Sequence, residues 1–156
     1  MRKLLVIVVI ILVGMAYAGD KKILHKGGFH ASRSARQAIS YARAQLGKPY
    51  LWGAVGPDAF DCSGLTYRAW RLPSSQRTSE QQWSAQQHVS YPHPGDLVYF
   101  RGVLVGGEAP PGHVGIVIGK NKMIDGYGSG TVMRVESFGK ATSAPGLQEV
   151  MGFTRP

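Results

Sequence analysis

The first half of the chain carries apolar residues at helical spacing. Between residues 32 and 46 they recur three or four positions apart, which is typical of a helix with one buried face. A similar pattern follows the cysteine, and Thr78 and Gln81 have the Thr-x-x-Gln spacing of a capping box that begins a helix. The pattern predicts three helices, over 32–46, from about Cys62 to Pro73, and over 79–87.

The second half of the chain has the pattern of strands. Short apolar runs rich in β-branched and aromatic residues alternate with turns of glycine, proline and lysine. A tight turn at 120–122 predicts a hairpin between two of the runs. Helices followed by strands indicate the α+β class, with N-terminal helices packed on a C-terminal antiparallel sheet. The predicted strands are 97–100, 113–119, 122–125, 132–138 and 149–153.

The first residues have the pattern of a secretory signal peptide. Two basic residues precede an unbroken apolar run over 4–13, and Ala16 and Ala18 form a small-x-small cleavage site. An uncleaved anchor is the alternative, but the apolar stretch is shorter than the roughly 20 residues of a membrane span. We expect a signal peptide at 1–18, a flexible lead-in at 19–31 and one domain at 32–156, secreted or in the bacterial wall compartment and free of the membrane after cleavage.

The net charge of the chain indicates which class of molecule it binds. The 156 residues include 18 Lys and Arg against nine Asp and Glu, a formal net charge of +9. Such a balance favours polyanions, and outside the cell wall polymer is the most available of these. The basic residues are scattered and do not alternate with aromatic ones as in a nucleic-acid groove, so no nucleic-acid partner is predicted.

The single cysteine raises the question of catalysis. Cys62 cannot form an internal disulfide, so in a secreted chain it is buried and inert, linked to another chain, or reactive. At a helix N-terminus, backbone amides and the helix dipole favour a thiolate and can hold an oxyanion. A thiolate needs a base, and His113 opens the most apolar strand.

Asp125 is the candidate third member of this group. If the 120–122 turn makes a hairpin, antiparallel pairing puts His113 and Asp125 side by side, where the carboxylate would orient the imidazole. Taken singly, the histidine could be structural and the aspartate a turn residue. The chain has no Cys/His cluster and no His-Glu-x-x-His, so no metal and no cofactor are predicted.

Three segments in this order resemble one known family. FDCSGL, PGDLVYF and GHVGIVIGKNKMID are similar to the NlpC/P60 cysteine peptidases, and the likeness extends from about Ile39 to Phe153. The resemblance implies a papain-like α+β domain that cuts peptidoglycan stem peptides, usually between γ-D-glutamyl and a diamino acid. It also implies Cys62 as nucleophile, His113 as base and Asp125 as the third catalytic residue, a position where family members commonly carry histidine.

The resemblance further implies substrate contacts. Tyr50 is similar to a tyrosine that lines the family's pocket, and Asp61 and Ser63 match positions that contact the substrate peptide in some members. Ser79 resembles a serine that can line the cleft, although it could equally serve as a helix cap beside Thr78. We also expect the chain to be a monomer.

Other functions remain open from the sequence. One is an N-acetylmuramoyl-L-alanine amidase of the CHAP type, which uses a similar Cys-His-acid set. Another is a wall-binding module without catalysis, and a third is a structural protein linked through its odd cysteine. The glycine-rich segment 101–112 is either a lid over the cleft or a passive loop.

Overall fold

The computed structural model describes residues 33–101, 111–142, 145–147 and 149–156. The predicted signal peptide and lead-in lie outside these residues, as does nearly all of the segment 101–112. In the described ranges, no helix is both long and apolar enough to cross a membrane.

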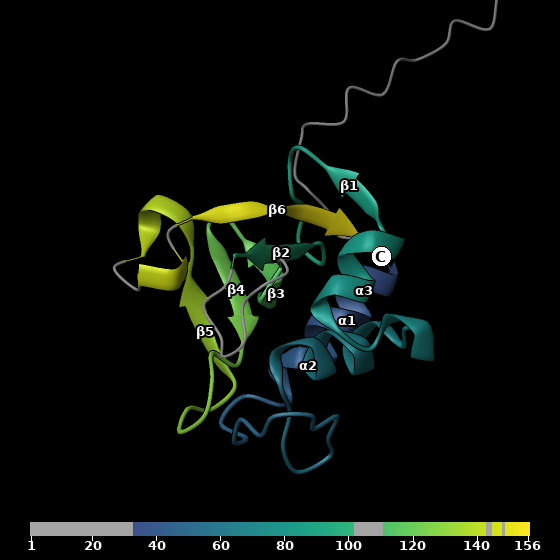
Figure 1. Ribbon diagram of the computed structural model, residues 1–156, viewed down its shortest axis with the longest axis vertical. Coiled ribbons are helices and arrows are strands. Elements are labelled where there is room, and N and C mark those ends of the chain that lie inside the picture. Colours follow the sequence, from purple (N-terminus) through teal and green to yellow (C-terminus); the bar gives the residue numbers. More distant parts are fainter. Residues whose placement is uncertain (1–32, 102–110, 143–144, 148) are drawn as a thin grey trace, which may run out of the picture.

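Helices come first along the described chain and strands follow (Figure 1). The helices are α1 (Arg33–Arg43), α2 (Cys62–Trp70) and α3 (Ser79–Ala85), with short 3-10 turns at Ser74–Gln76, Gly139–Ala141 and Pro145–Leu147. The strands are β1 (Gln87–Val89), β2 (Leu97–Phe100), β3 (His113–Gly119), β4 (Lys122–Asp125), β5 (Arg134–Ser137) and β6 (Val150–Arg155).

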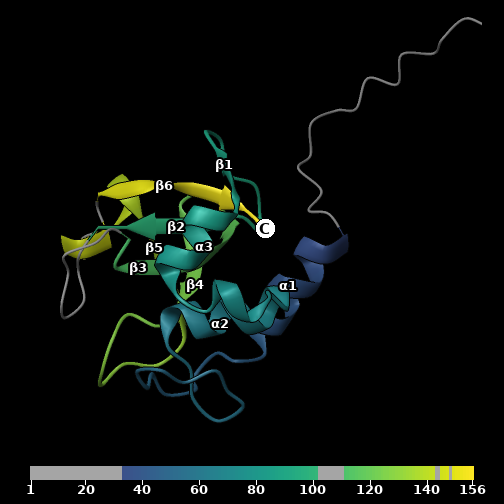
Figure 2. The same cartoon turned by 45° about the vertical axis from the view of Figure 1, so that its right-hand side comes forward.

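The strands form one antiparallel sheet in the order β1-β6-β2-β3-β4-β5. Figures 1 and 2 show the three helices gathered on one side of this sheet, where α2 packs against β3 and α1 against α2. The α+β prediction is therefore confirmed.

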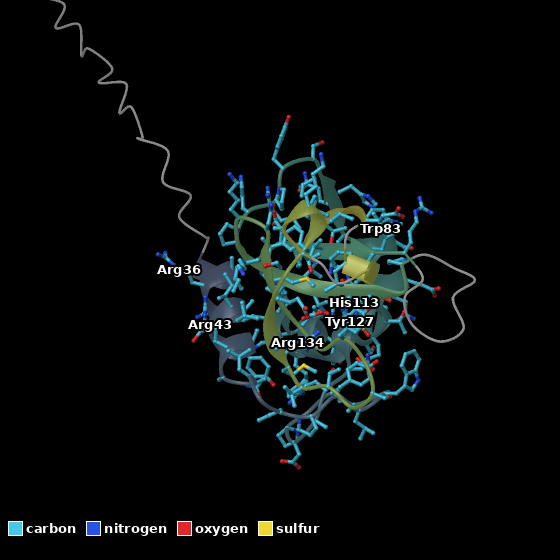
Figure 3. The ribbon with its side chains drawn as sticks, turned by 90° about the vertical axis from the view of Figure 1, so that its left-hand side faces the viewer. Arg36, Arg43, Trp83, His113, Tyr127 and Arg134 are labelled. Carbon is cyan, nitrogen blue, oxygen red and sulfur yellow. The ribbon has the colours of Figure 1, made fainter. Side chains whose placement is uncertain are left out.

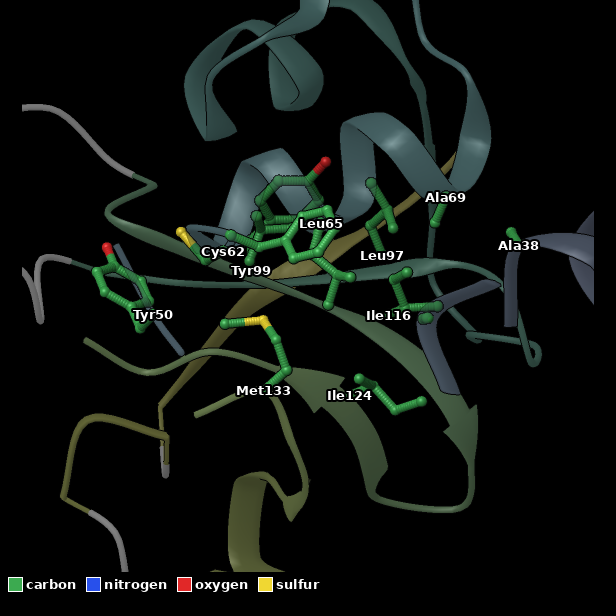
Figure 4. Packing of buried hydrophobic residues seen from close by; sticks show 13 residues of the cluster. Ala38, Tyr50, Cys62, Leu65, Ala69, Leu97, Tyr99, Ile116, Ile124 and Met133 are labelled. Carbon is green, nitrogen blue, oxygen red and sulfur yellow. The ribbon is translucent and has the colours of Figure 1, made fainter. Parts of the chain in front are cut away.

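The hydrophobic core has two parts, one on each face of the sheet. Leu97 and Tyr99 of β2 join the cluster beneath the helices (Figure 4), whereas Val98 and Phe100 join a second cluster on the opposite face. Because successive strand residues face opposite sides, a strand covered on both faces is apolar throughout, as LVYF is.

The helix ends agree only partly with the predicted ones. The capping box of α3 is confirmed, since Gln81 N donates to Thr78 Oγ1 at 3.3 Å and Thr78 N donates to Gln81 Oε1 at 3.1 Å. The prediction that α2 runs to Pro73 is wrong. It ends at Trp70 because Arg71 adopts a left-handed conformation with φ 54° and ψ 46°.

The strand β1 is absent from the predicted set, and Gln87, predicted as the end of the third helix, belongs to it. The helix stops earlier because Gln86 is extended, with φ −103° and ψ 162°. The Gln86 side chain accepts a 2.6 Å hydrogen bond from the Thr154 hydroxyl, next to the β1–β6 pairing. A contact with β6 that the sequence does not reveal therefore ends α3.

Candidate active site

The motif Asp-Cys-Ser-Gly builds the first turn of α2. Asp61 is the N-cap and accepts a hydrogen bond from Gly64 N at 2.6 Å, which makes Cys62 the first residue of the helix. Glycine is required at position 64 because a Cβ there would collide with the carbonyl oxygen of Ala54. Cys62 therefore lies where backbone amides have no acceptor inside the helix, as predicted.

Asp61 also anchors two other segments. Its carboxylate forms an ion pair with Arg77, at 2.7 Å from Nη2 to Oδ2, and accepts from Gly53 N at 2.8 Å. Ser63 Oγ donates to the same carboxylate at 3.3 Å and accepts from Arg77 Nη1 at 3.0 Å. Both oxygens of Asp61 thus have protein donors, which gives Asp61 and Ser63 a structural role beside the predicted substrate contacts.

His113 and Asp125 meet at the end of the sheet that faces the start of α2. The Nε2 atom of His113 lies 2.8 Å from Oδ2 of Asp125, and both side chains are fully buried. The predicted side-by-side pairing is nevertheless wrong. Ile116 pairs with Ile124, so Asp125 falls across from Gly115, two residues beyond His113.

The hairpin turn and a glycine explain this diagonal contact. The turn is formed by Lys120 and Asn121, the latter with φ 52°, within the predicted range 120–122, but the pairing that it sets places Ile116 rather than Val114 across from Ile124. At Gly115 a Cβ would lie 2.6 Å from Met123 Sδ and 3.3 Å from Asp125 Cβ. Because no side chain stands there, the carboxylate reaches along the strand to the imidazole.

The imidazole is held in an aromatic setting with two acidic neighbours. The ring centroid of His113 lies 5.7 Å from that of Phe100 and 5.8 Å from that of Tyr127, which Figure 3 shows beside it. Burial lowers the pKa of His113, but interactions with the Asp125 carboxylate and the Cys62 thiol outweigh it and raise the pKa to about 10. The structure therefore favours the imidazolium beside the thiol.

Unpartnered polar atoms gather at this place. Among the described residues, the buried side-chain polar atoms without a hydrogen bond are Tyr50 Oη, His113 Nδ1 and Asp125 Oδ1. Each such atom costs roughly 1–3 kcal/mol, so three in one site indicate a functional requirement. Since Nε2 is engaged by Asp125, Nδ1 is the ring nitrogen left to exchange a proton with the thiol.

Tyr50 lies beside the cysteine. Figure 4 shows the Tyr50 hydroxyl and the Cys62 sulfur at the same end of the core. Burial, followed by the charges of Cys62 and Asp61, raises the pKa of Tyr50 above its ordinary value. The phenol thus stays protonated and has a proton to donate.

These residues agree with a comparison against known families. The family model described as NlpC/P60 family matches residues 47–150, which include Cys62, His113 and Asp125. The chain belongs to the NlpC/P60 family.

Relatives in this family share part of their length with the chain. The probable endopeptidase p60 of Listeria grayi is 41% identical over 105 residues, covering 64% of this chain and 20% of that protein. The murein DD-endopeptidase MepH of Escherichia coli is 32% identical over 133 residues, covering 78% of this chain and 46% of that protein. The chain therefore spans less than half the length of these two relatives.

Solved structures confirm the NlpC/P60 fold. The peptidoglycan hydrolase RipB of Mycobacterium tuberculosis superimposes with a TM-score of 0.59 at 28% identity, over 78% of this chain and 64% of that one.

Ser79 makes a contact in this NlpC/P60 chain that the sequence does not predict. Thr78 caps α3, and the Ser79 hydroxyl donates to the carbonyl oxygen of Pro111 at 2.8 Å. Pro111 lies two residues before His113, so Ser79 ties the start of α3 to the approach to the imidazole.

Sequence reasoning missed two residues that support the NlpC/P60 site. Arg77 fixes Asp61, as described above, and the fully buried Gln82 accepts from Thr66 Oγ1 at 2.7 Å and donates to Ser63 O at 3.1 Å. Gln82 thereby locks α3 to the first turns of α2. The α3 sequence SEQQWSA is polar almost throughout, so no pattern marks one of its glutamines as buried.

Proposed function

We propose that this chain is a secreted cysteine endopeptidase that hydrolyses peptidoglycan stem peptides. The observation that carries the proposal is the set of unpartnered atoms on Tyr50, His113 and Asp125, beside the cysteine that begins α2. A nucleophile, a base and an orienting carboxylate are the parts that acyl transfer through a thiol requires. Family membership and the names of the relatives indicate the wall as the substrate.

The proposed reaction proceeds through an acyl-enzyme. The Cys62 thiolate attacks the amide carbonyl, and the Cys62 backbone amide and the Tyr50 hydroxyl stabilise the oxyanion. The His113 imidazolium gives its proton to the leaving amine as the carbon–nitrogen bond breaks, which leaves a thioester. Neutral His113 then takes a proton from water, whose oxygen attacks the thioester and releases the acid and the thiolate. Asp125 holds the ring in orientation throughout.

The proposed scissile bond lies between γ-D-glutamyl and a diamino acid. A DD bond is the second candidate, because the E. coli relative is named a murein DD-endopeptidase. Mass spectrometry of fragments from purified wall of known stem composition distinguishes them. We expect a new amino group on the diamino acid and a new carboxyl group on glutamate. A new D-alanine carboxyl would favour the DD bond, and a freed L-alanine amine would instead identify an amidase.

We predict that Tyr50→Phe lowers kcat by about 100-fold with little change in KM, because it removes one of two oxyanion donors and leaves the ring in place. Tyr127→Phe is a matched control, since it makes the same chemical change on another tyrosine whose ring lies beside His113. Steady-state rates on a soluble muropeptide measure both. An unchanged kcat in Tyr50→Phe, or an equal loss in both variants, would rule out this role for the Tyr50 hydroxyl.

A further inference from the structure

A groove of about 750 Å³ lies between α1 and α2. It is lined by one stripe of α1, made of Ser34, Gln37 and Tyr41, and by residues 67–72 at the end of α2. Cys62 begins this nine-residue helix, so the helical residues of the groove lie about 8–12 Å along the helix from the nucleophile. Its volume is in the range of roughly 300–1,000 Å³ that is typical of ligand sites. We call it the α1–α2 groove.

The lining combines aromatic rings with cations. Tyr41, Tyr67 and Trp70 are each partly exposed in the groove, and Arg68 and Arg71 are exposed. The indole of Trp70 is fixed by a 3.1 Å hydrogen bond from Nε1 to the carbonyl oxygen of Gly95. Fixed aromatic faces suit the flat apolar sides of sugar rings, and a guanidinium suits a carboxylate through two parallel hydrogen bonds.

The two arginines of the groove have no acidic residue near them in the sequence and belong to none of the ion pairs of the described residues. The chain has no Asp or Glu from residue 33 to 57, nor from 62 to 79. Elsewhere in the described residues Arg77, Arg134 and Arg155 are each held in an ion pair, whereas none of the described ion pairs includes Arg68 or Arg71. Their charge is therefore available to an anionic ligand.

Arg71 also occupies a backbone position that disfavours it. It follows the last turn of α2 with φ 54°, the left-handed region in which helices usually place glycine. A residue with a long cationic side chain is uncommon at such a position.

We propose that the α1–α2 groove binds an acidic glycan strand of the wall, so that the chain is retained on its substrate polymer. The proposal rests on the proposed function for the location of the protein. Charge disfavours the other occupants: residues 1–32 contain five Lys or Arg and one Asp, and a second copy of the chain carries +9. Aromatic stacking adds to the charge and favours sugar over a simple polyphosphate.

The test is calorimetric titration of the full chain with peptide-free glycan strands, whose muramic acid units keep free carboxylates. These strands contain no peptide bond to cut, so binding is measured independently of the proposed hydrolysis. Arg68→Gln with Arg71→Gln should raise the Kd at least about tenfold, and Tyr67→Leu should raise it about fivefold. Melting temperatures of the variants establish that they are folded.

The matched control is Arg36→Gln with Arg43→Gln, which removes the same charge from exposed α1 positions outside the groove (Figure 3). It should change the Kd by no more than about twofold. An equal effect of control and groove variants would overturn the proposal in favour of diffuse charge. So would equally tight binding of polyphosphate or single-stranded DNA, undiminished binding by Tyr67→Leu, or no binding of the strands.

Discussion

Replacing Cys62 with alanine should abolish the release of peptide fragments from purified wall, with kcat/KM lower by at least about 10³-fold. No other group of the proposed site can form the acyl-enzyme, because in the proposed mechanism His113 and Asp125 only move and orient protons. The fold should persist, since Cys62 is 5% exposed and alanine keeps its Cβ within the same cluster. Mass spectrometry of the released fragments and the melting temperature measure the two effects.

The single cysteine sharpens this experiment. A thiol-directed alkylating reagent can label the 156-residue chain only once, at Cys62, and activity should disappear in step with that label. Ser84→Ala is the control, because it removes one heteroatom from an exposed position of α3. Fragment release by Cys62→Ala at the normal rate would refute the nucleophile assignment. Wall binding without fragments from either protein would indicate a non-catalytic module instead.

Local chemistry explains why several elements could be predicted. The side chains of Thr78 and Gln81 each accept a hydrogen bond from the other residue's backbone amide within one turn. The start of α3 can therefore be recognised from a four-residue sequence motif. The start of α2 is equally local, since Asp61 caps the helix through Gly64 N. The end of α2 could not be found in this way, because the left-handed residue is arginine rather than glycine.

The contact between His113 and Asp125 was predicted correctly, although the register was not. Turn position decides register, and a bulge between Val117 and Gly119 shifts the pairing near the turn. The two side chains meet only because position 115 has none. The sequence spacing was therefore enough to predict that His113 and Asp125 meet. The physical reason for their contact is the missing side chain at Gly115, which the spacing does not reveal.

Long-range partners were the part that sequence reasoning could not supply. Arg77 lies 16 residues from Asp61, and Gln82 lies 16 residues from Thr66, so nothing local links the members of either pair. The α1–α2 groove likewise exists only once α1 packs on α2. All of these features are tertiary, and the contacts of Arg77 and Gln82 are also the ones that hold the first turn of α2 in place.

Asp125→Asn should lower kcat/KM at neutral pH by about 100-fold and move the alkaline limb of its pH profile to lower pH. The Asp125 carboxylate helps to raise the pKa of His113 to about 10, so the imidazolium proposed to protonate the leaving amine is lost as pH rises through that value. With the neutral amide the pKa of His113 falls, and the loss begins at lower pH. Asp58→Asn is the control, because it makes the same change at an exposed aspartate. It should leave both kcat/KM and the alkaline limb of the pH profile unchanged.

The pH dependence of folding stability provides a second test of the interaction between His113 and Asp125. Because the pKa of His113 is raised from 6.5 to about 10, its contribution to the free energy of unfolding is complete below about pH 6.5 and is lost as pH rises towards 10. Denaturant unfolding of the wild type should therefore show decreasing stability across this window, and Asp125→Asn should show a smaller decrease. A lower rate with an unmoved alkaline limb and the same pH dependence of unfolding would mean that Asp125 shapes the site without affecting the protonation of His113.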